Sequence, residues 1–149
     1  YKVVVATNQS GLSRGLFDSY ALANMHQIMC SMVEEKGGEI AGVFFCPHGP
    51  KDECICRKPK PGLLDQIELE FSMSVKGSWF IGDTEKDVET ALAKDCKPIL
   101  VLTGKGTQAL EGLSKEKRKL VYVCDDLFSA ASYILSGLNG DMKSEIIHV

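Results

Sequence analysis

Short apolar runs alternate with helix-length segments along this chain, and this alternation constrains the fold more than any other sequence feature. The runs at 3–5, 40–45 and 99–102 are almost entirely apolar, which is typical of strands buried on both faces. Strands of this kind that alternate with helices form βα units, and these assemble into a parallel sheet with helices on both sides. The sequence therefore predicts an α/β fold of three layers with a Rossmann-like architecture.

The 149 residues have the length of one domain, so we expect a single domain over 1–149. In chain order the predicted elements are a strand at 3–5, a helix at 18–36, a strand at 40–45, a loop at 46–61, a short helix from 62, a strand at 79–81, a helix at 83–94, strands at 99–102 and 120–123, and a helix at 126–135. Ligands of such sheets bind beyond the carboxyl ends of the strands. The residues that follow each strand are therefore the first candidates for a site.

Charge and composition narrow the classes of partner. The formal net charge is −3, so the chain has no overall basic field for a nucleic-acid backbone. The longest apolar stretch, 40–46, is far too short to cross a bilayer. We therefore expect neither a nucleic-acid nor a membrane partner. We also expect a small-molecule substrate and a monomeric protein.

Three of the six cysteines fall close together with a histidine. Cys46, His48, Cys54 and Cys56 form the pattern C-x-H-x5-C-x-C, in which residues two apart point the same way in an extended segment. Three thiolates and one imidazole make a closed tetrahedral Zn²⁺ site, which is usually structural. Scattered core cysteines are the weaker alternative, because proline, glycine and charged residues interrupt the segment. A metal cluster of this kind indicates a reducing compartment, so we expect a cytoplasmic protein.

A second candidate site follows the strand at 79–81. Asp83 stands at the strand end and Asp87 one helical turn later, and a carboxylate in this position suits Mg²⁺. The alternative is an ordinary helix start with acidic residues in its first turn.

Two further segments could bind a phosphoryl group. Thr7 and Asn8 end the first strand, and Arg57 and Lys58 follow the last thiolate directly. Taken singly, they could be an Asx-type turn and a solvated charge pair. Beside a metal carboxylate, they indicate a phosphate clamp.

The order of these motifs resembles that of phosphatases in the haloacid-dehalogenase superfamily. The motifs are T-N-Q-S-G at 7–11, R-G-x-F at 14–17, C-P-H-x5-C-x-C-R-K-P-x-P-G at 46–62, G-D-T-E-K-D at 82–87 and L-T-G-K-G at 102–106. Within the superfamily the chain is similar to the small, capless, zinc-loop branch, which acts on heptose bisphosphate or histidinol phosphate. The first two motifs are closer to the heptose members.

The resemblance implies a role for each matching residue. Thr7 would bind the transferring phosphoryl group, and Lys58, or less favourably Lys60, would neutralise it. The substrate-binding residues that it implies are Asn8, Gln9, Ser10, Arg14, Arg57 and Lys58.

The metal ligands implied by the resemblance agree with those derived above. Asp83 would bind Mg²⁺ with Asp87 in support, and the cysteine and histidine cluster would bind structural Zn²⁺. The heptose members often carry lysine where this chain has Thr84, which removes one expected substrate contact.

One motif of the superfamily has no counterpart in these 149 residues. An N-terminal D-x-D normally supplies the nucleophile and the acid–base aspartate, and no D-x-D precedes Thr7. Its strand would lie centrally, between the strands that end at Thr7 and before Asp83. Without it, two strands would lack hydrogen-bonding partners. We therefore expect the domain to be N-terminally incomplete, without its central strand and its nucleophile, and these 149 residues alone to be inactive.

The leading hypothesis is a Mg²⁺-dependent phosphatase of a small sugar phosphate, namely the 7-phosphate of D-glycero-D-manno-heptose 1,7-bisphosphate. Histidinol phosphate is the alternative substrate. A catalytically inactive zinc-containing scaffold is the alternative from another class. A dinucleotide-binding domain is disfavoured because no G-x-G-x-x-G opens the first helix.

Overall fold

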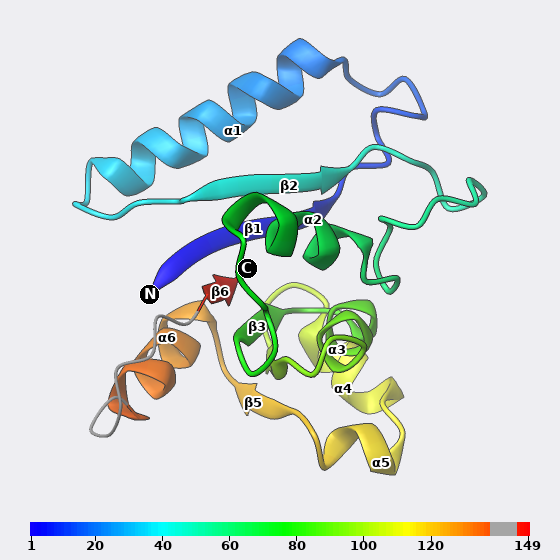
Figure 1. Ribbon diagram of the computed structural model, residues 1–149. Coiled ribbons are helices and arrows are strands. Elements are labelled where there is room, and N and C mark those ends of the chain that lie inside the picture. The colour runs from blue at the N-terminus through cyan, green and yellow to red at the C-terminus, as the bar shows by residue number, and fades with distance from the viewer. Residues whose placement is uncertain (138–145) are drawn as a thin grey trace.

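The computed structural model describes residues 1–137 and 146–149, and its centre is a six-stranded sheet (Figure 1). The strand order is β2-β1-β6-β3-β4-β5, and every neighbouring pair is parallel. The strands are β1 (Lys2–Asn8), β2 (Gly42–Cys46), β3 (Trp79–Gly82), β4 (Lys97–Val101), β5 (Tyr122–Cys124) and β6 (Ile146–His148). The predicted α/β class is confirmed.

Helices cover both faces of this sheet, as three layers require. They are α1 (Ser19–Glu34), α2 (Gly62–Phe71), α3 (Glu85–Leu92), α4 (Gly106–Gly112), α5 (Lys115–Arg118) and α6 (Leu127–Ser136). With right-handed crossovers, the strand order puts α1 and α6 on one face and α2, α3 and α4 on the other. None of the helices in the described part of the chain is both long and apolar enough to cross a membrane.

Strand β3 shows why the apolar runs are nearly continuous. Phe80 packs into a cluster with Leu63 and Ile67 of α2, whereas its neighbour Ile81 packs with Ile134 of α6. Successive side chains of a strand point to opposite faces, so both must be apolar when both faces are covered.

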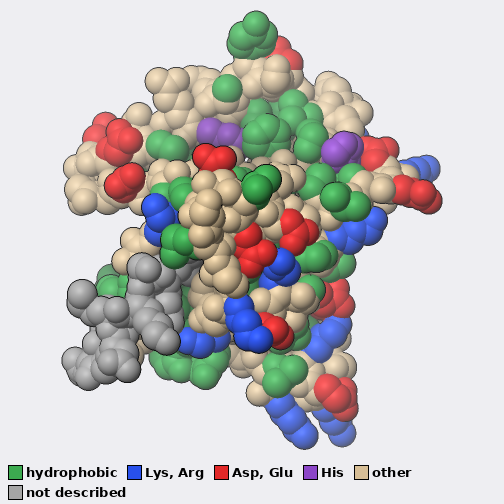
Figure 2. Space-filling view, in the orientation of Figure 1, with side chains coloured by type: hydrophobic (Ala, Val, Ile, Leu, Met, Phe, Trp, Pro, Cys, Tyr) green, Lys and Arg blue, Asp and Glu red, His purple; other side chains and the backbone are tan. Residues whose placement is uncertain are grey.

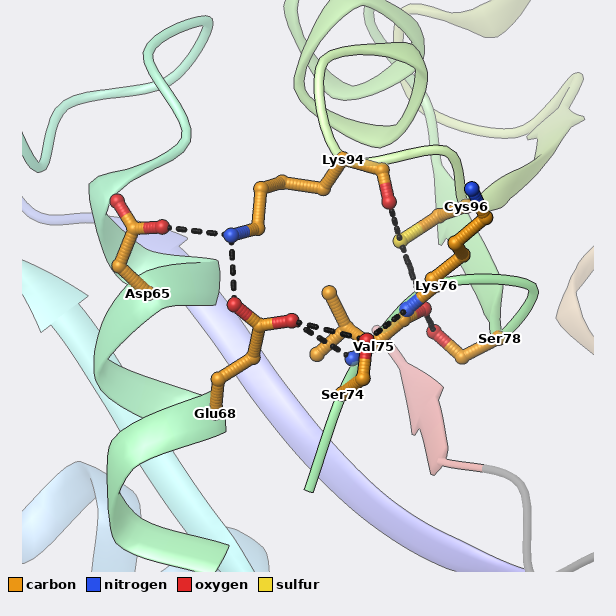
Figure 3. Close-up of polar contacts among 8 residues, drawn as sticks. All are labelled: Asp65, Glu68, Ser74, Val75, Lys76, Ser78, Lys94 and Cys96. Carbon is orange, nitrogen blue, oxygen red and sulfur yellow. Dashed lines mark hydrogen bonds and ion pairs between the residues drawn. The ribbon is translucent and has the colours of Figure 1, made fainter. Parts of the chain in front are cut away.

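A polar network ties α2 to the end of α3 at the amino edge of the sheet (Figure 3). Lys94 Nζ lies 2.8 Å from an Asp65 oxygen and 2.6 Å from a Glu68 oxygen. The other Glu68 oxygen accepts the Val75 N–H at 3.0 Å. Hydrogen bonding to Asp65 and Glu68 raises the pKa of Lys94. The network fixes the turn that leads into β3, and therefore the direction from which β3 reaches the site.

Strand β6 lies between β1 and β3, at the position where the missing central strand is expected from the sequence. The Ala6 N–H donates to the Val149 carbonyl at 2.9 Å, and the Val149 N–H donates to the Val4 carbonyl at 2.9 Å. On its other side, β6 pairs with β3 through Trp79 and Phe80. The expectation that two strands would lack partners is therefore wrong. The sequence missed β6, α4 and α5 because such short elements offer too few positions for a periodic pattern.

The predicted strand at 120–123 is shifted along the chain. The Leu120 N–H donates to the Lys117 carbonyl at 3.0 Å and closes the end of α5. Leu120 therefore belongs to the turn, and β5 begins at Tyr122.

Candidate active site

A cavity of about 390 Å³ opens at the carboxyl edge of the sheet. Thr7 from β1, Asp83 from the end of β3 and Thr103 from the end of β4 line it, together with Lys58 and Asp87. Since all strands are parallel, their carboxyl ends meet at this edge. The structure thus brings Thr7, Lys58, Asp83 and Asp87 together, as the sequence predicted for a single site.

Lys58 is held rigidly at the wall of the cavity. Its Nζ lies 2.7 Å from the Ala6 carbonyl oxygen and 2.7 Å from Asp87 Oδ1. The same ammonium lies 5.8 Å from the centre of the Phe80 ring. An ammonium fixed by three partners in this way can meet an anion without needing to reorganise.

Asn8 and Gln9 contact the site residues but are absent from the cavity lining. Asn8 Nδ2 donates to the Lys58 carbonyl at 3.2 Å, and Asn8 Oδ1 accepts the Lys58 N–H at 3.1 Å. Gln9 Nε2 donates to Thr7 Oγ1 at 3.3 Å. Asn8 therefore positions the lysine loop against β1, and Gln9 orients the Thr7 hydroxyl.

Asp83 receives its position from the turn after β4. Its Oδ2 accepts the Lys105 N–H at 3.0 Å. Gly104 stands in this turn at φ +59°, and a Cβ there would lie 2.3 Å from Asp83 Oδ2. Only glycine combines that backbone conformation with so close an approach. The L-T-G-K-G motif thus shapes the Asp83 carboxylate site, a role that the sequence did not assign to it.

Asp87 plays a different part from Asp83. Its Oδ1 pairs with Lys58, while its Oδ2 accepts the Thr84 N–H at 3.0 Å and the Thr84 hydroxyl at 2.6 Å. The Thr84 hydroxyl oxygen in turn accepts the Asp87 N–H at 3.3 Å, which completes a capping box at the start of α3. With both oxygens engaged, Asp87 positions Lys58, and Asp83 is the carboxylate available to a cation.

The donor set at Asp83 fits Mg²⁺. This ion is commonly bound by one or two carboxylates, with water and substrate phosphate completing the octahedron. Asp83 supplies a half-buried carboxylate on the cavity wall, and Lys58 nearby complements a phosphate.

Cys46, His48, Cys54 and Cys56 form the metal cluster that the sequence predicted. Their ligand atoms all lie within 4.8 Å of one another. Cys46 Sγ lies 3.7 Å from Cys54 Sγ and 3.6 Å from His48 Nδ1, which lies 3.3 Å from Cys56 Sγ. A tetrahedron with Zn–S bonds of about 2.3 Å has edges of about 3.8 Å, so the observed separations fit Zn²⁺.

Burial and the neighbouring Cys46 and Cys54 thiols raise the pKa of Cys56 to about 12. A bound dication reverses such a rise, because it stabilises the thiolate.

The remaining predicted binding residues are absent from the cavity lining. Arg57 Nη1 donates to the His48 carbonyl at 3.1 Å, and Lys60 Nζ donates to the Cys54 carbonyl at 2.6 Å. Ser10 and Arg14 belong to the loop after β1, where the Arg14 N–H donates to the Ser10 carbonyl at 3.2 Å. Arg57 and Lys60 thus hydrogen-bond to the backbone of two metal ligands, His48 and Cys54.

A three-layer parallel sheet with a fixed lysine, a strand-end carboxylate and a threonine at its carboxyl edge defines a hydrolase of the haloacid-dehalogenase type. Residues 55–130 match the model of the HAD-hydrolase-like family, and the chain belongs to this family. The resemblance inferred from the motifs is confirmed.

More specific relatives cover most of the chain. It is 47% identical over 135 residues to the D-glycero-beta-D-manno-heptose-1,7-bisphosphate 7-phosphatase of Pseudomonas aeruginosa, covering 91% of this chain and 74% of that protein. Identity to the enzyme of the same name from Neisseria meningitidis is 42%, covering 91% and 72%.

Solved structures give the same result. The D,D-heptose 1,7-bisphosphate phosphatase of B. bronchiseptica, in complex with magnesium and phosphate, matches with a TM-score of 0.84 at 40% identity, covering 91% of this chain and 75% of that one. The enzyme of Burkholderia thailandensis matches with a TM-score of 0.69 at 35% identity, covering 91% and 76%.

Proposed function

We propose that this protein is a Mg²⁺-dependent phosphatase that removes the 7-phosphate of D-glycero-D-manno-heptose 1,7-bisphosphate. The observation that carries the proposal is the Lys58 ammonium, fixed between Ala6 and Asp87 at a cavity that also holds Thr7 and Asp83. The names of relatives up to 47% identical support this substrate.

Three residues of the cavity, Thr7, Lys58 and Asp83, have a part in this reaction. Lys58 neutralises the phosphoryl oxygens as negative charge gathers on them, and Thr7 binds one of those oxygens through its hydroxyl. Asp83 holds the Mg²⁺, which supplies Lewis-acid stabilisation of the same oxygens. The Zn²⁺ cluster is structural and holds the loop that carries Lys58 against β1.

In this proposal the attacking carboxylate comes from an aspartate upstream of Tyr1, and the domain includes the strand that carries this aspartate. Among the described acids of the cavity, Asp87 is engaged by Lys58 and Thr84, and Asp83 is assigned to the metal. The strand that carries this aspartate and β6 would then compete for the same position between β1 and β3. The intact mass of the protein purified from its natural source tests this point, and a species of 16.3 kDa with no N-terminal companion contradicts it.

The activity is tested by phosphate release from two substrates by the natural-length protein. We expect release from heptose 1,7-bisphosphate, with histidinol phosphate turned over much more slowly. Asp83→Asn should lose the Mg²⁺-dependent rate, because an amide is a poorer ligand for a hard cation. A preference for histidinol phosphate overturns the substrate, and no release from either substrate favours the inactive scaffold.

We also propose that the protein is monomeric and cytoplasmic. All six cysteines are free thiols, and the metal cluster needs three of them reduced. Light scattering after size exclusion tests the monomer, and fractionation of the source cells tests the compartment.

A further inference from the structure

A second hollow of about 220 Å³ lies beside the main cavity and is rich in cations. Arg57, Lys60 and Lys86 line it, with Lys58 common to both hollows. Figure 2 shows Lys and Arg side chains, with Asp and Glu side chains between them, along the edge of the molecule where the 46–61 loop lies in Figure 1. A phosphorylated end of a small molecule would therefore meet several positive charges next to the main cavity.

The positive charge of this hollow is largely uncompensated. Arg57 and Lys60 donate to backbone carbonyls, which satisfy hydrogen bonds without cancelling charge. The carboxylate in the lining is Asp52, which accepts the Gly49 N–H at 2.6 Å. Because Lys58 is paired with Asp87, the net charge of the hollow comes from the three other cations and one carboxylate.

Two acidic neighbours of Lys86 on α3, Glu85 and Glu89, form ion pairs with another lysine. Glu85, directly before it, lies 2.9 Å from Lys117 Nζ, and Glu89, three residues later, pairs with the same ammonium. Both carboxylates thus point to α5. The Thr84–Asp87 capping box holds the first turn of α3, and with it the Lys86 backbone, in place.

We propose that Lys86 is a specificity-determining residue that, with Arg57 and Lys60, binds the phosphate group that is not hydrolysed. This inference rests on the proposed function and deepens it. Since the two hollows meet at Lys58, a sugar with a phosphate at each end spans both, whereas a monophosphate fills the main cavity alone. Lys86 therefore discriminates between bisphosphorylated and monophosphorylated substrates.

The test is calorimetric binding of two probes to the full chain with Zn²⁺ and Mg²⁺ present. The probes are fructose 1,6-bisphosphate and fructose 6-phosphate. Lys86→Ala should weaken the bisphosphate about tenfold, as expected for a charge-assisted hydrogen bond, and change the monophosphate less than about twofold. Lys86→Arg should restore tight binding because it keeps the charge. Lys119→Ala, which removes an exposed lysine after α5, is the matched control and should leave both affinities unchanged.

Equal weakening of the two probes, no weakening of either, or no binding of the bisphosphate by the unmodified chain overturns the subsite. Hydrolysis separates this failure from that of the proposed function. An active enzyme whose KM for heptose 1,7-bisphosphate is unchanged by Lys86→Ala overturns the subsite and leaves the function intact. A protein that binds the bisphosphate through Lys86 but releases no phosphate from the heptose substrate overturns the function instead.

Discussion

Replacing Lys58 with methionine should lower the free energy of unfolding by about 3 kcal/mol, because the Asp87 carboxylate then stays buried without its cation. The two charged atoms are 2.7 Å apart, and the side chains are only 13% and 7% exposed. At an effective dielectric constant of about 20, this pair has a Coulomb energy of about 6 kcal/mol. Desolvation of both groups offsets part of that energy, and Thr84 still donates to one carboxylate oxygen in the variant.

Urea unfolding followed by the fluorescence of Trp79, with Zn²⁺ present throughout, measures this loss. The corresponding fall in melting temperature is about 6–12 °C for a domain of this size. Lys76→Met is the matched control, because Lys76 pairs with Asp95 at 3.1 Å but both side chains are at least 70% exposed. That substitution should cost less than about 0.5 kcal/mol.

A double variant identifies the cause of the loss. Asp87→Asn added to Lys58→Met should recover part of the stability, since no buried charge then remains. The reasoning is refuted if Lys58→Met unfolds within about 1 kcal/mol of the unmodified protein, or if it costs no more than Lys76→Met.

Three further outcomes follow from other parts of the molecule. Burial lowers the pKa of His148 from 6.5 to about 4. The unfolded chain therefore binds the extra proton between these values, and the histidine's contribution is complete above pH 6.5 and lost as the pH falls to 4. The free energy of unfolding, measured with urea, should fall by about 3 kcal/mol over this pH range. His148→Leu should remove this pH dependence, and an unchanged pH dependence contradicts the assignment. Chelation of Zn²⁺ from the natural-length protein should expose the 46–61 loop to protease and abolish phosphate release, with recovery on adding Zn²⁺. Full activity without zinc refutes the structural role of the ion. Gly106→Ala should destabilise the fold by about 2 kcal/mol in thermal unfolding, because a Cβ would lie 1.7 Å from the Val101 carbonyl oxygen. An unchanged melting temperature would show that the backbone shifts there without cost and would contradict this prediction.

The α/β class, the cysteine and histidine cluster and the carboxylate at the end of β3 could all be predicted from the sequence. These features are local: a buried strand is apolar on both faces, and ligands two residues apart point the same way within one segment. Cys46 and His48, for example, need no distant partner to be recognised as a metal-binding pair.

The tertiary structure alone decided the division of roles within the site and the identity of the central strand. Asn8 holds the backbone of Lys58 across 50 residues of sequence, and Asp87 engages the ammonium of the same lysine. Strand β6 pairs with both β1 and β3, although it lies at the other end of the chain from β1. Such pairings depend on which segments meet in the folded chain, and periodicity within a single segment carries no information about them.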